Sequence, residues 1–358
     1  MPLLPLYGHD ALRRRLQAAV ARGALPASLL LHGPRGIGKQ RLALWLGQLL
    51  LCDGAGARPC GQCTACRDAL QLAHPDLRWF FPHERADDDR DRAAKEVLDE
   101  NAERCAERAA ASGLYAPPPG TEAIYVADAR ALVWHAALTP TLAARKVIVV
   151  GDAERMVPQA GREEAANTFL KLLEEPPQDT TVILTTSEPG ALLPTIRSRV
   201  VAIRVAPLPE RDVRAWLADP AVVAALEDAG LPKGDSARVE LAAGAPGTLL
   251  GAGAREAAAE SARRILAAAS ADRATQMRTA FTLSNTKARG GFTESLDALT
   301  VILHQRARDA ALHNDPHAAA AAARAIDAVQ DARERAGGNV SPQLLGAALV
   351  RRLARELA

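Results

Sequence analysis

The sequence feature that most constrains the fold is the segment at residues 29–40, "LLLHGPRGIGKQ". Its apolar start predicts a buried strand, and residues 39–51 carry a pattern typical of a helix. Gly33, Gly36, Gly38 and Lys39 match the phosphate-binding pattern G-x-x-x-x-G-K-[ST]. In that pattern, backbone N–H groups and the helix N-terminus hold phosphate oxygens. The segment therefore predicts a strand–loop–helix unit of an α/β domain.

The last position of this pattern holds Gln40 instead of Ser or Thr. The missing hydroxyl normally binds Mg²⁺, and the longer amide of Gln40 does not reach the same place. Two interpretations stay open. Lys39 could still hold a phosphate or a nucleotide, or the loop could be a tight turn without a ligand.

A second departure follows the predicted strand "KVIVV", where Gly151, Asp152, Ala153 and Glu154 stand. A hydrolysing loop of this kind needs two adjacent acids there, one for Mg²⁺ and one to orient water. Depending on the alignment, Gly151 replaces the first acid or Ala153 replaces the second, and Asp152 is equally typical of a helix N-cap. Because metal and electrostatic groups supply most of the catalysis of phosphoryl transfer, we predict that the chain does not hydrolyse ATP.

Four cysteines lie within fifteen positions: Cys52, Cys60, Cys63 and Cys66. Their C-x7-C-x2-C-x2-C spacing predicts one tetrahedral Zn²⁺ site per chain. With four thiolates the site leaves no position for water, so the zinc is structural. The alternative is four reduced cysteines without metal. Cys105 stands apart and carries no predicted role.

Further strands are expected at 145–151, 180–187 and 200–208. Helices are expected at 8–23, near the start of the chain, and at 163–177, between the first two of these strands. This alternation predicts a parallel α/β sheet. The charge-dense stretch 83–112 is interpreted as a solvated helix or a partly disordered insertion. After residue 208 the chain is expected to be helical, with breaks near 289–292 and 337–342.

Composition limits the partners that the chain can have alone. A net charge of +2 and an aromatic content of 3% argue against a zinc-containing protein that binds nucleic acid by itself. No apolar run of 18 residues and no signal peptide is apparent, so we expect no membrane partner and a cytoplasmic location.

The segment "PTIRSRVV" at 194–201 contains Arg199 just before a predicted strand. Such an arginine is most often a solvated surface charge. It could also be a finger offered to a nucleotide that a neighbouring subunit holds.

Taken together, these motifs resemble the delta prime family of clamp-loader subunits of bacterial DNA polymerase III. The resemblance covers most of the first 250 residues. It is carried by "GPRGIGKQ", the cysteine module followed by "HPD", "NTFLKLLEEPP", "TSEPGALLPTIRSRV" and "AAGAPG". The C-terminal third matches mainly in being helical.

The resemblance implies an α/β plus all-α architecture. A RecA-like AAA+ P-loop domain with a parallel sheet would span 1–207 and contain the zinc module at about 52–76. A small helical lid at 208–253 and a C-terminal helical collar for oligomerisation at 254–358 would follow.

The resemblance also implies a heteropentamer with ATP-hydrolysing gamma or tau subunits and a delta subunit, which loads the sliding clamp onto primed DNA. In that assembly a delta prime subunit does not hydrolyse ATP, and Arg199 matches the arginine that reaches the ATP of the adjacent gamma subunit. Val200 stands where the family usually has cysteine. The alternative is an active gamma/tau-type ATPase, which shares the zinc module and the LEEPP helix.

Overall fold

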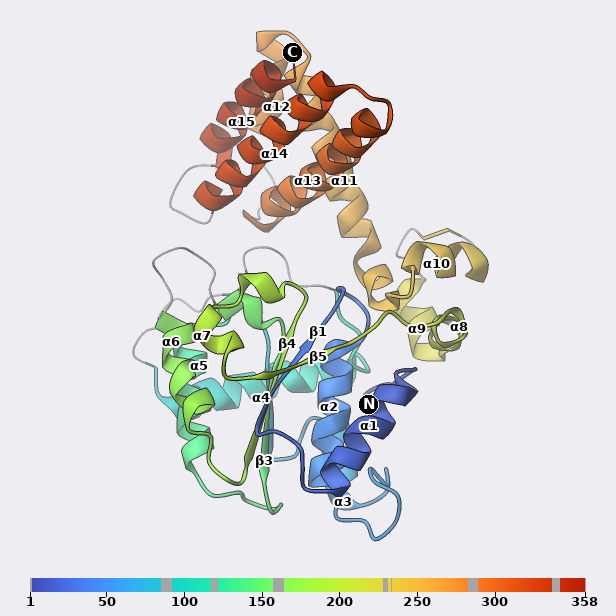
Figure 1. The fold of residues 1–358 in the computed structure, drawn as a ribbon, viewed down its shortest axis with the longest axis vertical. Coiled ribbons are helices and arrows are strands. Elements are labelled where there is room, and N and C mark those ends of the chain that lie inside the picture. Colours follow the sequence, from blue (N-terminus) through green and yellow to red (C-terminus); the bar gives the residue numbers. More distant parts are fainter. Residues whose placement is uncertain are drawn as a thin grey trace. The chain divides into compact units, whose positions relative to one another are not determined.

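The computed structural model describes residues 2–84, 92–116, 122–156, 164–227, 231–232, 234–282, 289–336 and 342–357. The chain divides into two compact units, and within the described residues the first ends at Gly251 and the second begins at Ala252. The first unit contains the sheet and the second is helical (Figure 1).

The core of the first unit is a five-stranded sheet in the order β2-β3-β4-β1-β5, with every pair parallel. The strands are β1 (Ser28–His32), β2 (Leu77–Phe80), β3 (Lys146–Val150), β4 (Thr180–Thr186) and β5 (Val201–Arg204). The three central strands are buried along almost their whole length, as in a parallel sheet covered by helices on both faces. Together with the phosphate loop after β1, this sheet is that of a RecA-like AAA+ P-loop domain.

Alternate residues of the strands enter two separate cores. Leu29 and Leu31 pack with α2 on one face, while Leu30 packs with α5 and α6 on the other. Figure 1 shows the helices on the two sides of the sheet. The helices of this α/β part are α1 (Asp10–Ala21), α2 (Lys39–Leu51), α3 (Thr64–Leu70), α4 (Ala94–Ala110), α5 (Val126–Ala137), α6 (Glu164–Glu174) and α7 (Pro194–Arg197).

The last part of the first unit is a small helical cluster. It consists of α8 (Glu210–Leu217), α9 (Pro220–Leu226), α10 (Asp235–Ala242) and the 3₁₀ turn η3 (Pro246–Gly251). Its apolar core includes Trp216 and Leu249, and Leu4 and Tyr7 of the N-terminal segment pack against it. The Tyr7 hydroxyl donates to Asp219 Oδ2 over 2.6 Å, which ties that segment to the cluster.

The second unit consists of α11 (Ala252–Ala269), α12 (Arg273–Thr282), α13 (Arg289–Leu312), α14 (Pro316–Ala336) and α15 (Pro342–Glu356). Its described core residues come from α11, α13, α14 and α15, and α12 lies against α11 and α15. Helix α13 begins at Arg289, and residues 283–288 before it lie outside the described part of the chain, so the break expected near 289–292 stays a prediction. A break that we did not predict separates α13 from α14. The break expected near 337–342 falls largely on residues outside the described part of the chain.

The solvated-helix interpretation of 83–112 is also wrong for one face of the segment. Helix α4 buries Val97, Leu98, Asn101 and Cys105, and the Cys105 thiol donates to the carbonyl oxygen of Trp79 in β2. The segment therefore covers the β2 edge of the sheet. Residues 85–91 lie outside the described part of the chain.

Candidate phosphate loop, cysteine cluster and Arg199

The phosphate loop connects the end of β1 to the start of α2. Gly36 and Gly38 have φ angles of 80° and 88°, which glycine adopts without strain. Gly38 is the N-cap of α2, so the first N–H groups of that helix face the loop. The four residues Gly33, Gly36, Gly38 and Lys39 thus lie together as the motif requires.

Lys39 is buried, and its ammonium group bonds within the chain. Nζ donates to the carbonyl oxygens of Gly33 and Pro34 and to Ser187 Oγ, at 2.8–2.9 Å. Burial lowers the pKa of Lys39 to about 8, although the charges of Asp152 and Glu154 oppose the shift. The loop lysine is therefore folded back onto its own loop and onto the end of β4.

Gln40 bridges two groups that approach from β2 and from the end of β3. The indole Nε1 of Trp79 donates to Gln40 Oε1 over 3.0 Å, and Gln40 Nε2 donates to Asp152 Oδ2 over 2.9 Å. Both polar ends of the amide therefore have partners inside the chain.

Gly151 lies directly beneath this amide. A Cβ at Gly151 would stand 2.8 Å from Gln40 Nε2 and closer still to Oε1. The geometry thus favours the alignment in which Gly151 replaces the metal-binding acid, because that position points at the eighth residue of the loop. Asp152 uses its carboxylate on Gln40, and its backbone N–H donates to Thr185 Oγ1 over 3.2 Å.

Glu154 lies in the turn η1 (Ala153–Met156) and is buried. Its Oε1 accepts from the backbone N–H of Ser187 over 3.1 Å, while its buried Oε2 meets no partner among the described residues. Burial and the nearby charge of Asp152 raise the pKa of Glu154. Ser187 thus connects Glu154 to Lys39.

The small helical cluster touches the loop directly. Gly247 N–H donates to the Gly36 carbonyl oxygen over 2.9 Å, and a Cβ at Gly36 would stand 2.7 Å from the backbone nitrogen of Thr248. His9 also bonds from its ring Nε2 to the Ile37 carbonyl oxygen at 2.8 Å. The loop is therefore packed against its own chain on several sides.

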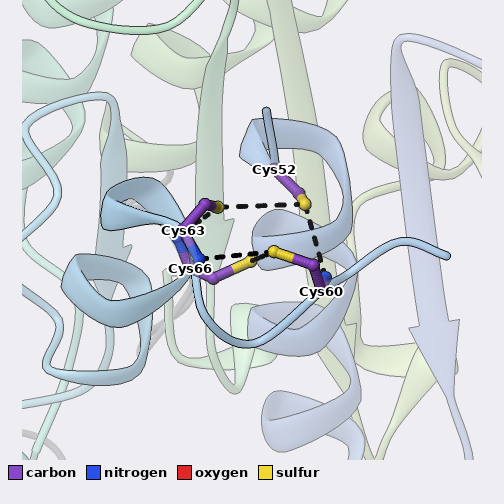
Figure 2. A group of neighbouring side chains, drawn as sticks. All are labelled: Cys52, Cys60, Cys63 and Cys66. Atoms are coloured by element: carbon purple, nitrogen blue, oxygen red, sulfur yellow. Dashed lines mark hydrogen bonds between the residues drawn. The ribbon is translucent and has the colours of Figure 1, made fainter. Parts of the chain in front are cut away.

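The four cysteines predicted as metal ligands lie together at the end of α2 and the start of α3 (Figure 2). All four sulfur atoms lie within 4.8 Å of one another, with Cys52 and Cys63 3.9 Å apart and Cys60 and Cys66 4.0 Å apart. A tetrahedral Zn²⁺ with Zn–S bonds of about 2.3 Å places its sulfurs about 3.8 Å apart.

Backbone N–H groups support the sulfurs from nearby. The N–H groups of Cys60, Cys63 and Cys66 donate to Cys52, Cys60 and Cys63 Sγ respectively, at 3.3–3.4 Å. The bonds from the Cys63 and Gln62 backbone lower the pKa of Cys60 to about 6. Four thiol groups with these donors fit the ligand set of a closed metal site.

Arg199 lies apart from both groups, between α7 and β5. A third of its side chain is exposed, and its Nη2 pairs with Glu174 Oε1 of α6 over 2.7 Å. Its Nη1 donates to the Thr195 carbonyl oxygen over 2.8 Å and to Ser198 Oγ over 3.3 Å. These contacts hold the guanidinium in one orientation at the surface.

Three partners of these residues were missed from the sequence: Trp79, Ser187 and Glu174. Signals for the last two were present. Ser187 ends an apolar strand at the edge where ligands of parallel sheets bind, and Glu174 belongs to the LEEPP motif. Trp79 had no such signal, because its role depends on α4 covering β2.

Comparison with known proteins agrees with these features. The profile of the family described as "DNA polymerase III, delta subunit" matches residues 8–209, more than half of the 358 residues. The DNA polymerase III subunit delta' of Pseudomonas aeruginosa is 36% identical over 181 residues, which are 50% of this chain and 43% of that protein.

The subunit delta' of Escherichia coli is 29% identical over 237 residues, covering 66% of this chain and 57% of that one. The gamma/tau subunit of Mycobacterium bovis is 30% identical over 214 residues, covering 60% and 30%. The chain thus spans about half the length of the delta' relatives that it matches.

Among solved structures, a gamma subunit-related protein of Thermotoga maritima covers 97% of this chain and 98% of its own, with a TM-score of 0.40 and 16% identity. The described helices include none with the length and apolar character that crossing a bilayer needs. On the match over residues 8–209, the chain belongs to the DNA polymerase III delta-subunit family.

Proposed function

We propose that the chain is a non-hydrolysing subunit of a clamp-loader complex of DNA polymerase III. Gamma/tau and delta subunits would be its direct partners, and the complex would load the sliding clamp onto primed DNA. One observation carries the absence of hydrolysis: Lys39 and Gln40 are bonded within the chain where a hydrolysing loop would hold phosphates and Mg²⁺.

We propose that Arg199 acts in trans on the ATP of the neighbouring gamma subunit. Its guanidinium is partly exposed, and Glu174 and the Thr195 carbonyl oxygen fix its direction. A fixed cation of this kind stabilises the charge that develops on a transferring phosphoryl group.

The cysteine cluster is proposed to hold one structural Zn²⁺ per chain. Its thiol groups meet the distances of a tetrahedral site, and four protein ligands leave no position open for a reacting water. The ion would join the end of α2 to α3 and would take no part in the chemistry.

The arginine proposal is tested in a complex reconstituted with gamma and delta subunits. Arg199→Ala should remove fast hydrolysis at one gamma site, since a missing arginine finger costs about 10³-fold or more at the site it serves. Rapid-quench counting of the ATP hydrolysed in the first turnover, with clamp and primed DNA present, measures this directly.

The exposed Arg197, two residues away, provides the control. Arg197→Ala should leave the number of rapidly hydrolysed ATP molecules unchanged. An unchanged count with Arg199→Ala would contradict the role in trans.

The alternative function is an active gamma/tau-type ATPase, which the retained Lys39 and the similarity to the gamma/tau subunit of M. bovis favour. Magnesium-dependent ATP turnover by the purified chain alone would establish this alternative. If the chain alone shows no turnover while the reconstituted complex hydrolyses ATP, the result supports the non-hydrolysing subunit.

A further inference from the structure

The carboxamide of Gln40 lies at the end of β3, where the ligands of a divalent cation would meet. We propose that this amide takes the place of the metal ion, so that the phosphate loop is insensitive to divalent cations. The inference deepens the proposed function, because it gives a physical reason why the chain does not hydrolyse ATP.

The orientation of the amide follows from its partners. The indole nitrogen of Trp79 can only donate, so the group that faces it must be Gln40 Oε1. The carboxylate of Asp152 can only accept when ionised, so it faces the Nε2 side. Both polar ends of the amide are thereby used, and Gln40 and Trp79 are 8% and 2% exposed. The oxygen end of the amide is therefore engaged by the indole N–H, and the nitrogen end by the carboxylate.

The Nε2 group also gives Asp152 a hydrogen-bond donor where a cation would approach it. Mg²⁺ requires near-octahedral oxygen ligands at about 2.0–2.1 Å. An amide NH₂ that donates to Asp152 Oδ2 over 2.9 Å occupies the approach to this oxygen as a neutral donor. One oxygen of Asp152 is therefore engaged by the amide and is not free to bind a cation.

The glycine at the end of β3 is part of the same arrangement. A side chain at Gly151 would overlap the Gln40 amide, whose Cδ lies 2.5 Å from the position of a Cβ there. An acid at 151 and a glutamine at 40 thus compete for one volume. Gln40 and Gly151, the two departures from the ATPase pattern, are far apart in the sequence but depend on each other in the folded chain.

The experiment measures ATP retention by the intact chain in equilibrium dialysis, with magnesium in excess and with EDTA. The wild-type chain should retain the same amount of ATP in both conditions. Retention of no ATP in either condition also agrees with this expectation. Gln40→Ser removes the amide and restores the hydroxyl of the motif. The affinity of this variant for ATP should be at least about tenfold higher with magnesium than with EDTA, a gain of about 1.4 kcal/mol.

Two controls accompany this variant. Gln48 is a second buried glutamine of α2, whose amide donates to the Cys66 carbonyl oxygen away from the loop. Gln48→Ser should show no dependence on magnesium. Lys39→Ala added to Gln40→Ser should abolish the gain, because the phosphate contact is lost.

Magnesium-dependent retention by the wild-type chain would overturn the proposal. So would a Gln40→Ser chain that is folded by circular dichroism and still shows no gain with magnesium. If Gln40→Ser does not fold, Gln40→Thr restores the same hydroxyl and is read in the same way. Neither failure touches the Arg199 proposal, which is read from hydrolysis by the neighbouring subunit.

Discussion

A β-carbon at Gly151 would stand 2.5 Å from Cδ of the Gln40 amide, so this position has no room for a side chain. From the sequence, Gln40 and Gly151 were read as two separate losses, and the alignment around Asp152 stayed open. Side-chain packing between residues this far apart in the chain has no local signal, so only the folded arrangement shows that the two positions depend on each other.

This dependence predicts a coupled effect on stability. Gly151→Ala should destabilise the first unit by about 1–3 kcal/mol, because overpacking displaces the amide from Trp79 and Asp152. In a Gln40→Ser background the same change should cost less than about 0.5 kcal/mol. Urea unfolding of the four chains of the cycle measures the coupling.

The matched control for this cycle is Gly190→Ala, since a Cβ at Gly190 meets nothing within 4 Å. That change should have the same small effect in both backgrounds. Equal costs of Gly151→Ala in the two backgrounds would show that the amide does not occupy the space above the glycine.

At the scale of elements, the strand–loop–helix unit was predicted well from sequence. The expected helix at 39–51 matches α2, and strands expected at 145–151 and 180–187 contain β3 and β4. These elements have strong local patterns. Strand β2 was not assigned, because four residues after the cysteine module give too short a pattern. Helix α4 was misread because its many charges hide a narrow apolar stripe along one face.

A histidine joins two of these elements after β2. His83 Nε2 lies 2.9 Å from Asp128 Oδ2 of α5, and Nδ1 lies 2.7 Å from the Glu84 carbonyl oxygen. Both ring nitrogens face acceptors, an arrangement that a doubly protonated ring satisfies. Burial opposes the charge, as does Arg104, but the bond and charge of Asp128 outweigh them and raise the pKa of His83.

The raised pKa predicts a pH-dependent stability. The pKa of His83 in the folded chain lies above the unfolded value of about 6.5. The stabilisation from its charged ring is therefore complete below a pH of about 6.5. It should be lost as the pH rises through the folded pKa, at a cost of about 1 kcal/mol. Denaturant unfolding across this window measures the loss.

His83→Gln keeps a donor towards Asp128 but cannot titrate, so it should flatten the pH profile in this window. The carboxylates of Glu100 in α4 and of Glu122 also interact electrostatically with the His83 ring, and both residues are unchanged in this variant. A wild-type profile with the same slope as the variant would contradict the assignment to His83.

At the scale of the whole molecule, the sequence predicted the helical character of the chain after residue 208. The pattern along the chain, and then the resemblance, predicted three parts. The described residues form two compact units, the first of which contains the sheet and the small helical cluster. Whether that cluster is a separate lid domain stays a proposal, because its core also takes up Leu4 and Tyr7 from the N-terminal segment.

The two units should respond differently to metal removal. The cysteine cluster lies in the first unit, whereas the described core residues of the second unit come from α11, α13, α14 and α15. Zinc stabilises only the state whose ligands are assembled, so a chelator should lower the unfolding temperature of the first unit by several degrees or more. The unfolding temperature of the second unit should stay the same. Calorimetry of the full chain with and without chelator resolves the two transitions.

Cys60→Ser should reproduce the effect of the chelator, because three thiolates bind Zn²⁺ less tightly than four. Cys105→Ser is the matched control, since the Cys105 thiol bonds to the Trp79 carbonyl oxygen and not to the cluster. Its melting should remain sensitive to the chelator. A single transition that moves as a whole would mean that the two units unfold together, and no shift in either would mean that the four cysteines hold no metal.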